Sequence, residues 1–504
     1  MTQELPHGVP DLRARVMRGL AWVAASQVVF HVTRAIAAIL IARLLTPDEY
    51  GLAALAIVFA SLVMIFSDLA LGAALIQRPT LSERDKNTAF WVTVGSGVLF
   101  TAIGVGLAGP IASLYGQPQA KPLLMALSGS FIVTALGATQ LTLMMREMDF
   151  RQTELLGLAG SLVGAGCGVA LAATGSGSWA IIAQFVAGAI VTTALVWVRS
   201  SWYPRLMFSK ASLLDLGGFS IYMLGQRILY YLQVNGDRFL IGRFLGTTAL
   251  GTYAVAYNTM LVPASKIGGP LQRVFSPAFS RIQDEPERIA ATWARVGRII
   301  AVVAVPMLGG LVVVAPDFVP VILGQQWTEA VPVVQVLAWV GIIQAIQALN
   351  YDVLMARDRT RTMFLFSLFL TASHLVAFSL GLEWGVVGVA AAYAISTTLV
   401  EPYQTVLAAR CLGVSPMVFF RALSGVFQAG FVMCAIVFAV RVSLVDAGVP
   451  QALRLFICVA VGAVAYAGLC AWRVPEIAAE VRGVLRRRRG GAPAMPPAAA
   501  AAER

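Results

Sequence analysis

Three basic residues lie inside apolar stretches of this sequence, where a charge is costly: Arg34, Arg227 and Lys266. A cation at the centre of a bilayer costs about 2.5–3.5 kcal/mol on insertion scales, so it normally faces a cavity or a partner. Arginine also presents a planar fork of donors that matches phosphate oxygens. These positions therefore predict a membrane-embedded site for a phosphate-bearing anion. Snorkelling or a structural ion pair is the alternative for each, most of all for Lys266 near a helix end.

Polar side chains flank both arginines. Gln27 and His31 precede Arg34 by seven and three residues, which places all three on one face of a helix. The neighbours of Arg227 on its own helix are Gln226, Tyr230 and Tyr231. We expect these residues to line a binding site for a diphosphate and its sugars. His31 titrates near neutral pH when unperturbed, but a hydrogen-bonded structural histidine is the favoured alternative.

Four further polar residues lie at or near membrane depth and are candidates for gating or ion coupling: Asp68, Asp237, Asn258 and Asp352. Asp68 could pair with an arginine or carry a coupling proton. It could equally be a helix-end carboxylate near Arg78. The residues leave open whether transport is coupled to a proton or a sodium gradient, and they predict no other cofactor and no metal site.

Membrane-spanning helices must position these residues. The chain is 58% hydrophobic and 12% charged, with a mean hydropathy of +0.78, whereas soluble domains carry about 25% charged residues. A bilayer core takes about 20 apolar residues per crossing. The expected fold is therefore an all-α polytopic membrane protein with about fourteen transmembrane helices. The predicted spans are 19–44, 51–76, 88–110, 122–145, 154–174, 178–198, 213–234, 239–264, 296–315, 330–355, 362–382, 385–409, 423–442 and 453–472.

The distribution of positive charge predicts the orientation. Most of the 37 lysines and arginines fall in alternate connecting segments, as the positive-inside rule requires of cytoplasmic loops. Both termini are therefore predicted to be cytoplasmic. The predicted organisation is an N-terminal segment 1–18, a first lobe 19–210, a second lobe 211–410, a final helix pair 411–475 and a disordered basic tail 476–504.

An internal repeat supports the division into lobes. Residues 41–56, IARLLTPDEYGLAALA, and residues 241–256, IGRFLGTTALGTYAVA, share six identical positions without a gap. A second echo pairs residues 187–193 with residues 392–398. Two echoes at nearly one offset predict a duplicated six-helix bundle, with the substrate site between two parallel lobes. An arginine from each lobe would then face a shared cleft.

The sequence argues against other classes of protein. Its positive charges lie between apolar spans, so a nucleic-acid partner is not expected. The five cysteines form no metal-ligand or disulfide pattern. Connecting loops are too short for a soluble catalytic domain. We therefore do not expect an enzyme. A membrane-embedded polysaccharide polymerase or glycosyltransferase is the alternative from that class.

Several motifs together resemble a known family. They are the segment 41–56, residues 66–72 (FSDLALG), residues 282–288 (IQDEPER), residues 323–327 (LGQQW) and residues 383–390 (EWGVVGVA). Over about residues 15 to 475 the chain is similar to the Wzx-type oligosaccharide flippases, the polysaccharide-transport branch of a superfamily that includes multidrug and toxin extruders and the lipid II flippase.

The resemblance implies two six-helix lobes, a central cavity and two additional C-terminal helices. It implies transfer of an undecaprenyl-diphosphate-linked repeat unit from the cytoplasmic to the periplasmic leaflet of a bacterial inner membrane. A polysaccharide polymerase and other export components would be partners, besides membrane lipids. The alternatives within the superfamily are a lipid II flippase and a multidrug or cation antiporter. An antiporter would favour a buried acidic site, whereas the intramembrane charges found in this sequence are mainly basic.

Overall fold

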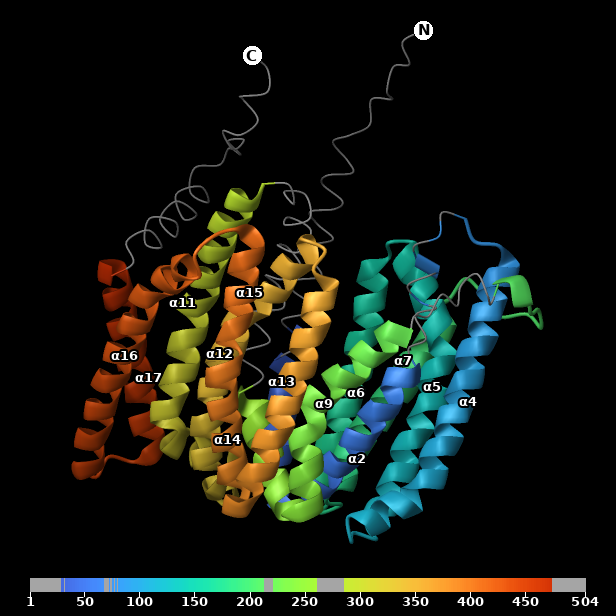
Figure 1. Cartoon of the computed structure of the whole chain (residues 1–504). Helices are drawn as coiled ribbons and strands as arrows, with labels where there is room; N and C mark the ends of the chain where they lie inside the picture. Colours follow the sequence, from blue (N-terminus) through green and yellow to red (C-terminus); the bar gives the residue numbers. More distant parts are fainter. Residues whose placement is uncertain are drawn as a thin grey trace, which may run out of the picture. The chain divides into compact units, whose positions relative to one another are not determined.

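A computed structural model describes residues 29–67 except 31, 72–212 except 73, 74, 77 and 79, 221–260 and 285–473. Every regular element among these residues is a helix (Figure 1). The chain divides into two compact units. The first draws on Met1–Ala256, Ile322–Val333 and Ser367–Tyr393, and the second on Tyr257–Val321, Val334–Phe366 and Ala394–Arg504.

The first unit contains most of the N-terminal helices. After a helical segment at 32–44 come α2 (Pro47–Ser67), α4 (Glu83–Leu114), α5 (Ala120–Arg146), α6 (Phe150–Ala173), α7 (Trp179–Arg199) and α9 (Ile221–Phe244), followed by a helical stretch at 247–260. Packing is closest between α6 and α7 and between α4 and α5. These pairs follow each other directly in sequence, so the core of this unit forms from neighbouring helices joined by short loops.

The second unit contains most of the C-terminal helices. Its elements are α11 (Pro286–Phe318), η1 (Val319–Leu323), η2 (Gln325–Ala330), α12 (Val331–Ala356), α13 (Thr360–Gly381), η3 (Leu382–Trp384), α14 (Gly385–Val400), α15 (Pro402–Leu412), α16 (Met417–Asp446) and α17 (Gln451–Arg473). The division into units falls within this series, so η2, η3 and parts of α13 and α14 belong to the first unit. In the second unit α11 packs against α16 and α17, and Trp293 stacks on Phe419 at 4.3 Å between ring centroids.

Local sequence signals set several helix ends. Ser82 caps α4 by accepting a hydrogen bond from the Asp85 backbone N–H, while the Asp85 carboxylate accepts from the Ser82 N–H at 3.0 Å. This reciprocal capping box satisfies donors that a helix start leaves unpaired. Gly246 has a φ of +90°, a conformation that favours glycine, and it lies in the turn before the helical stretch 247–260.

The structure confirms an all-helical polytopic membrane protein. Nine candidate spans among the described residues are long and apolar enough to cross a bilayer. The boundary between the predicted seventh and eighth spans was wrong, because α9 continues to Phe244 and the turn lies at 245–246. The polar residues near 235–238 suggested a loop, yet they are helical. The remaining predicted spans overlap residues that the structure does not describe.

The two copies of the internal repeat pack against each other within the first unit. A methyl group at Gly51 would lie 1.8 Å from the Thr247 carbonyl oxygen, and one at Gly251 would lie 1.9 Å from the Pro47 carbonyl oxygen. These positions are equivalent in the repeat, so each copy meets the other in the same way. Only glycine permits so close an approach of two helix backbones. The hydroxyl of Thr247 also donates to the Asp48 carboxylate.

Candidate functional site

Arg34 lies in the helical segment 32–44 of the first unit. It lies ten residues before the end of the helical segment 32–44, or about 15 Å along the helix axis. Its side chain is exposed, and its guanidinium carbon lies 5.4 Å from the centre of the Phe30 ring. No acidic side chain among the described residues pairs with it. Its charge is therefore available to a ligand.

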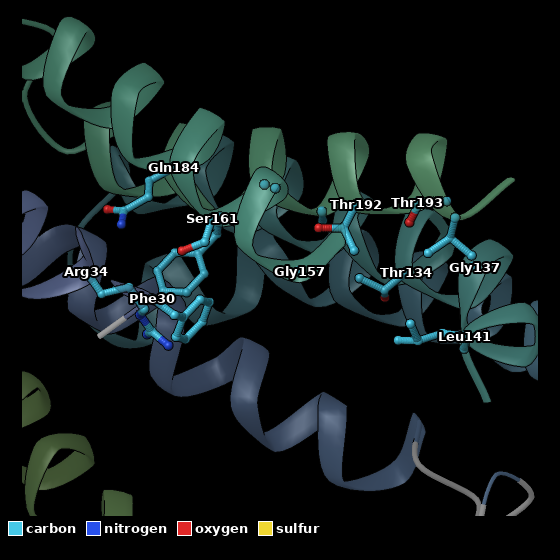
Figure 2. Close-up of a pocket in the computed structure, with 16 residues that line it drawn as sticks. Phe30, Arg34, Thr134, Gly137, Leu141, Gly157, Ser161, Gln184, Thr192 and Thr193 are labelled. Carbon is cyan, nitrogen blue, oxygen red and sulfur yellow. The ribbon is translucent and has the colours of Figure 1, made fainter. Parts of the chain in front are cut away.

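Arg34 lines a cavity of about 490 Å³ within the first unit. Segment 32–44 supplies one wall, and α5, α6 and α7 supply the others (Figure 2). Figure 2 shows Arg34, Phe30, Ser161 and Gln184 toward one end and Thr193, Gly137, Thr134 and Leu141 toward the other. The remaining lining residues are Ala138, Gly157, Gly160, Phe185, Gly188, Ala189, Thr192 and Val196. The cavity is thus mostly apolar, with a few polar groups and one cation.

Glycines bring two walls of this cavity together. A methyl group at Gly160 of α6 would lie 1.9 Å from the Thr192 hydroxyl oxygen and 2.8 Å from the Gly188 carbonyl oxygen of α7. One turn further along α6, a methyl group at Gly164 would lie 2.4 Å from the Gln184 carbonyl oxygen. Small residues allow this close packing of membrane helices. The contact fixes the positions of Gln184 and Thr192 at the cavity.

The polar lining divides into groups that are used by the fold and groups that are not. The Thr193 hydroxyl donates to the Val133 carbonyl oxygen at 2.9 Å, and the Thr134 hydroxyl donates to the Ser130 carbonyl oxygen at 3.0 Å. Among the described residues, the side chains of three other lining residues make no hydrogen bond within the protein: Ser161, Gln184 and Thr192. They can donate to oxygens of a bound ligand, close to a cation.

Two tyrosines predicted to face the site have different surroundings. Tyr230 of α9 is 68% exposed, whereas Tyr231 is buried and donates its hydroxyl to the Val58 carbonyl oxygen of α2 at 3.0 Å. Tyr231 therefore joins α9 to α2. Asp237 is fully buried in the same helix and accepts a hydrogen bond from the Tyr253 hydroxyl at 2.7 Å.

Two of the predicted candidates for gating or ion coupling lie in a different unit from Arg34. Asn258 is exposed and Asp352 is partly buried, and both belong to the second unit. Four predicted residues lie outside the described residues: Gln27, His31, Asp68 and Lys266. Gln226 and Arg227 lie in α9, but their side chains are not described. Their roles at the site stay predictions.

The sequence analysis missed the polar residues that line the cavity with Arg34. Ser161, Gln184 and Thr192 are single small or neutral polar residues inside apolar spans, and nothing in their spacing marks them. It also missed Glu401, a buried carboxyl between α14 and α15. A carboxyl followed by Pro402 inside an apolar run was a signal that could have been read. No cluster of three His, Cys, Asp or Glu side chains suited to a metal occurs among the described residues.

Comparison with known proteins places the chain among membrane proteins of polysaccharide synthesis. Residues 40–332 match the family described as polysaccharide biosynthesis protein. The lipopolysaccharide biosynthesis protein WzxC of Escherichia coli K12 is 28% identical over 400 residues, covering 79% of this chain and 80% of the relative. The teichuronic acid biosynthesis protein TuaB of Bacillus subtilis 168 is 26% identical over 479 residues, covering 94% and 99%.

Solved structures match the fold. The inward closed conformation of the lipid II flippase MurJ superposes with a TM-score of 0.73 at 13% identity, covering 90% of this chain and 99% of that one. An inward-facing multidrug resistance transporter of the MATE family superposes with a TM-score of 0.58 at 12% identity, covering 77% and 94%. At these identities the matches establish the architecture, and the arrangement around Arg34 has to be judged on its own chemistry.

Proposed function

Because this chain belongs to the polysaccharide biosynthesis family of multi-pass membrane transport proteins, we propose that it moves a lipid-linked oligosaccharide repeat unit across the membrane. The substrate class is an undecaprenyl diphosphate that carries sugars, and transfer runs from the cytoplasmic to the periplasmic leaflet. Relatives named for lipopolysaccharide and teichuronic acid biosynthesis support this class of substrate. A polymerase would consume the delivered repeat unit.

The observation that carries the proposal is Arg34, a cation that lines the cavity and pairs with no acid among the described residues. A diphosphate brings two negative charges that must leave water to cross the bilayer core. Arg34 can meet them with a planar fork of donors. Ser161, Gln184 and Thr192 line the same cavity and have donors that no described residue accepts from. A charge-assisted hydrogen bond in surroundings that exclude water is stronger than the same bond in solution.

The predicted second cation completes the proposed site. Arg227 lies in α9, which the internal repeat makes the equivalent of the first helix. One arginine from each repeat would then hold the diphosphate while the prenyl chain stays in lipid. Two like charges approach each other more easily with an anion between them, so substrate binding would favour closure. Rocking of the repeats would then expose the substrate to the opposite side.

Substitution of Arg34 tests the proposal in cells whose surface polymer depends on this chain. Arg34→Ala should abolish polymer export and cause lipid-linked repeat units to accumulate. Arg34→Lys should retain part of the export, since it keeps the charge and loses the planar fork. Lys121→Ala is the matched control, because it removes one exposed cation at the start of α5, away from the cavity.

The readouts are surface polymer, lipid-linked repeat units in membrane extracts, and the amount of protein in the membrane. Normal export by Arg34→Ala at a normal protein level would contradict the site. Loss of export without accumulation of lipid-linked units would contradict the proposed substrate. Equal loss in Lys121→Ala would show that the assay reports total charge rather than the cavity.

A further inference from the structure

The second unit contains a buried carboxyl for which the described residues supply no partner. Glu401 lies between α14 and α15 and is 6% exposed. Pro402 follows it and has no N–H, so the helical hydrogen bond to the Thr398 carbonyl cannot form. No described residue hydrogen-bonds or ion-pairs with the Glu401 carboxyl. Such a group is costly to keep charged in the interior of a membrane protein.

Two further polar groups share its face of the helix. Thr397 lies four residues before Glu401 and Gln404 three residues after it, so all three side chains point to one side. Thr397 is 0% and Gln404 2% exposed. The Thr397 hydroxyl oxygen and the Gln404 amide nitrogen have no hydrogen-bond partner among the described residues. Three adjacent polar side chains are therefore buried without satisfying one another.

The neighbouring residues of this unit form a connected network of buried hydrogen bonds. The Thr405 hydroxyl donates to Gln347 Oε1 at 2.9 Å, and Asn350 Nδ2 donates to the Thr405 hydroxyl oxygen at 3.1 Å. The Trp293 indole N–H donates to Asn350 Oδ1 at 2.8 Å. This connected network joins α11, α12 and α15 one residue away from Gln404. Buried polar groups are nearly always paired. The Thr397 hydroxyl and the Gln404 amide, which no described residue pairs with, can therefore each bind a further polar group.

No charged side chain in the described part of the chain pairs with Glu401. The ionisable side chains on α11, α12, α15 and the part of α13 in this unit are Glu287, Arg288, Arg295, Arg298, Asp317, Tyr351, Asp352, Arg361, Tyr403, Arg410 and Cys411. None of them hydrogen-bonds or ion-pairs with the Glu401 carboxyl in the described part of the chain. A proton removes the charge of the Glu401 carboxyl and turns one of its oxygens into a hydrogen-bond donor.

We propose that Glu401, with Thr397 and Gln404, forms a proton-binding site that couples transport to a proton gradient. The inference rests on the proposed transport function, and the site itself can be tested without a substrate. Glu401 takes up a proton when the site opens to water on one side and holds it while the site is buried, as in this structure. It releases the proton when the site opens to the other side. The step is reversible protonation of one carboxylate, with no other reactant.

A chemical probe tests the site in the full-length protein. A hydrophobic carbodiimide reacts with protonated carboxyls in apolar surroundings, and mass spectrometry locates the modified residue. We expect modification of Glu401 that decreases as the pH rises, and none at that position in Glu401→Gln. An unmodified Glu401 at low pH, in protein that binds the reagent elsewhere, would overturn the proposal. So would modification independent of pH.

Proton movement gives a second readout. Proteoliposomes containing the protein and a trapped pH-sensitive dye should show proton uptake when a pH gradient is imposed. Glu401→Gln keeps the shape and the burial of the side chain but cannot exchange a proton, so uptake should fall to that of protein-free vesicles. Thr405→Val is the control, because it disrupts the neighbouring network and leaves the Glu401 carboxyl intact. Uptake that depends on sodium rather than on pH, or that persists in Glu401→Gln, would overturn the proposal.

The export assay separates this inference from the proposed function. If Glu401→Gln exports polymer normally while Arg34→Ala does not, the flippase proposal stands and proton coupling at Glu401 is wrong. If Arg34→Ala exports normally while Glu401→Gln abolishes proton uptake, the proton site stands and the proposed substrate site is wrong. Loss of export in both variants, with proton uptake lost only in Glu401→Gln, supports both.

Discussion

Arg34 in the first unit and the pair Arg441 and Arg454 in the second unit hold their charges in opposite ways. Arg34 is exposed to a cavity and has no acidic partner among the described residues. Arg441 and Arg454 both bind the carboxylate of Asp317, which is completely buried. The Arg441 Nε–Asp317 Oδ2 distance is 2.6 Å, and the Arg454 Nε–Asp317 Oδ1 distance is 2.8 Å.

The two arrangements indicate different roles for the arginines. In the second unit, Asp317 of α11 joins α16 and α17, so the charges hold the last two helices in place. In the first unit, no acidic side chain among the described residues forms an ion pair with Arg34. A cation at membrane depth therefore has to be explained by its partners, and an arginine whose partners are absent from the fold is the better candidate for binding a ligand.

Reversing the charge at the cavity is the strongest test of whether Arg34 differs in role from Arg441 and Arg454. Arg34→Glu should abolish polymer export, because a carboxylate at that position repels a diphosphate. Thermal unfolding of the purified protein should change little, since Arg34 is exposed and pairs with no described acid. Lys121→Glu makes the same change of charge outside the cavity and should leave export intact. A large loss of thermal stability in Arg34→Glu would show that Arg34 is structural, like Arg441 and Arg454.

The reverse result is expected at the Asp317 cluster. Asp317→Asn leaves two guanidinium groups without their carboxylate, which should destabilise the protein by about 3–5 kcal/mol. Replacing all three residues together, as Asp317→Leu, Arg441→Met and Arg454→Met, removes the uncompensated charge and should restore most of that loss. Thermal unfolding in detergent measures both. A triple variant as unstable as Asp317→Asn would show that the cluster does more than pair charges.

The packing that shapes the cavity gives a smaller effect. Gly160→Ala places a methyl group against the Gly188 carbonyl oxygen and Thr192, and overpacking of this kind costs about 1–3 kcal/mol. Export should fall as well, because α6 and α7 are pushed apart at the cavity. Gly157→Ala is the matched control: it lines the same cavity, and nothing lies within 4 Å of the added methyl group. Equal effects of both variants would contradict the role of the close contact.

The sequence predicted the features that depend on composition and local pattern. Apolar runs located the spans, and the cost of a charge in lipid singled out Arg34 before its surroundings were known. The repeat predicted equivalent roles for Gly51 and Gly251, and in the structure these glycines meet each other. Each of these signals lies within one or two short segments, which is why it could be read directly.

Features that depend on distant contacts could not be read in the same way. Asp317 was not among the predicted site residues, because the contacts that join it to Arg441 and Arg454 span more than 120 positions in the sequence. Asp237 was predicted to lie at or near membrane depth, but its hydrogen bond with Tyr253, sixteen residues away, could not be read from the sequence pattern. Ser161, Gln184 and Thr192 acquire their significance only because glycines bring α6 and α7 together around the cavity.

The smallest predicted effect distinguishes two hydroxyls of the same cavity: one that hydrogen-bonds within the described part of the protein and one that does not. Ser161→Ala removes a hydroxyl that has no partner among the described residues, so stability should not change. Export should fall slightly, because the ligand loses one hydrogen bond that contributes about 0.5–1.5 kcal/mol to its binding free energy. Thr193→Val removes the hydroxyl that donates to Val133, so it should lower the unfolding temperature and leave export per folded molecule unchanged. Paired measurements of export and thermal unfolding test both. If the two variants exchanged these effects, the ligand would contact the Thr193 end of the cavity rather than the Arg34 end, and the assignment of polar groups around Arg34 would be wrong.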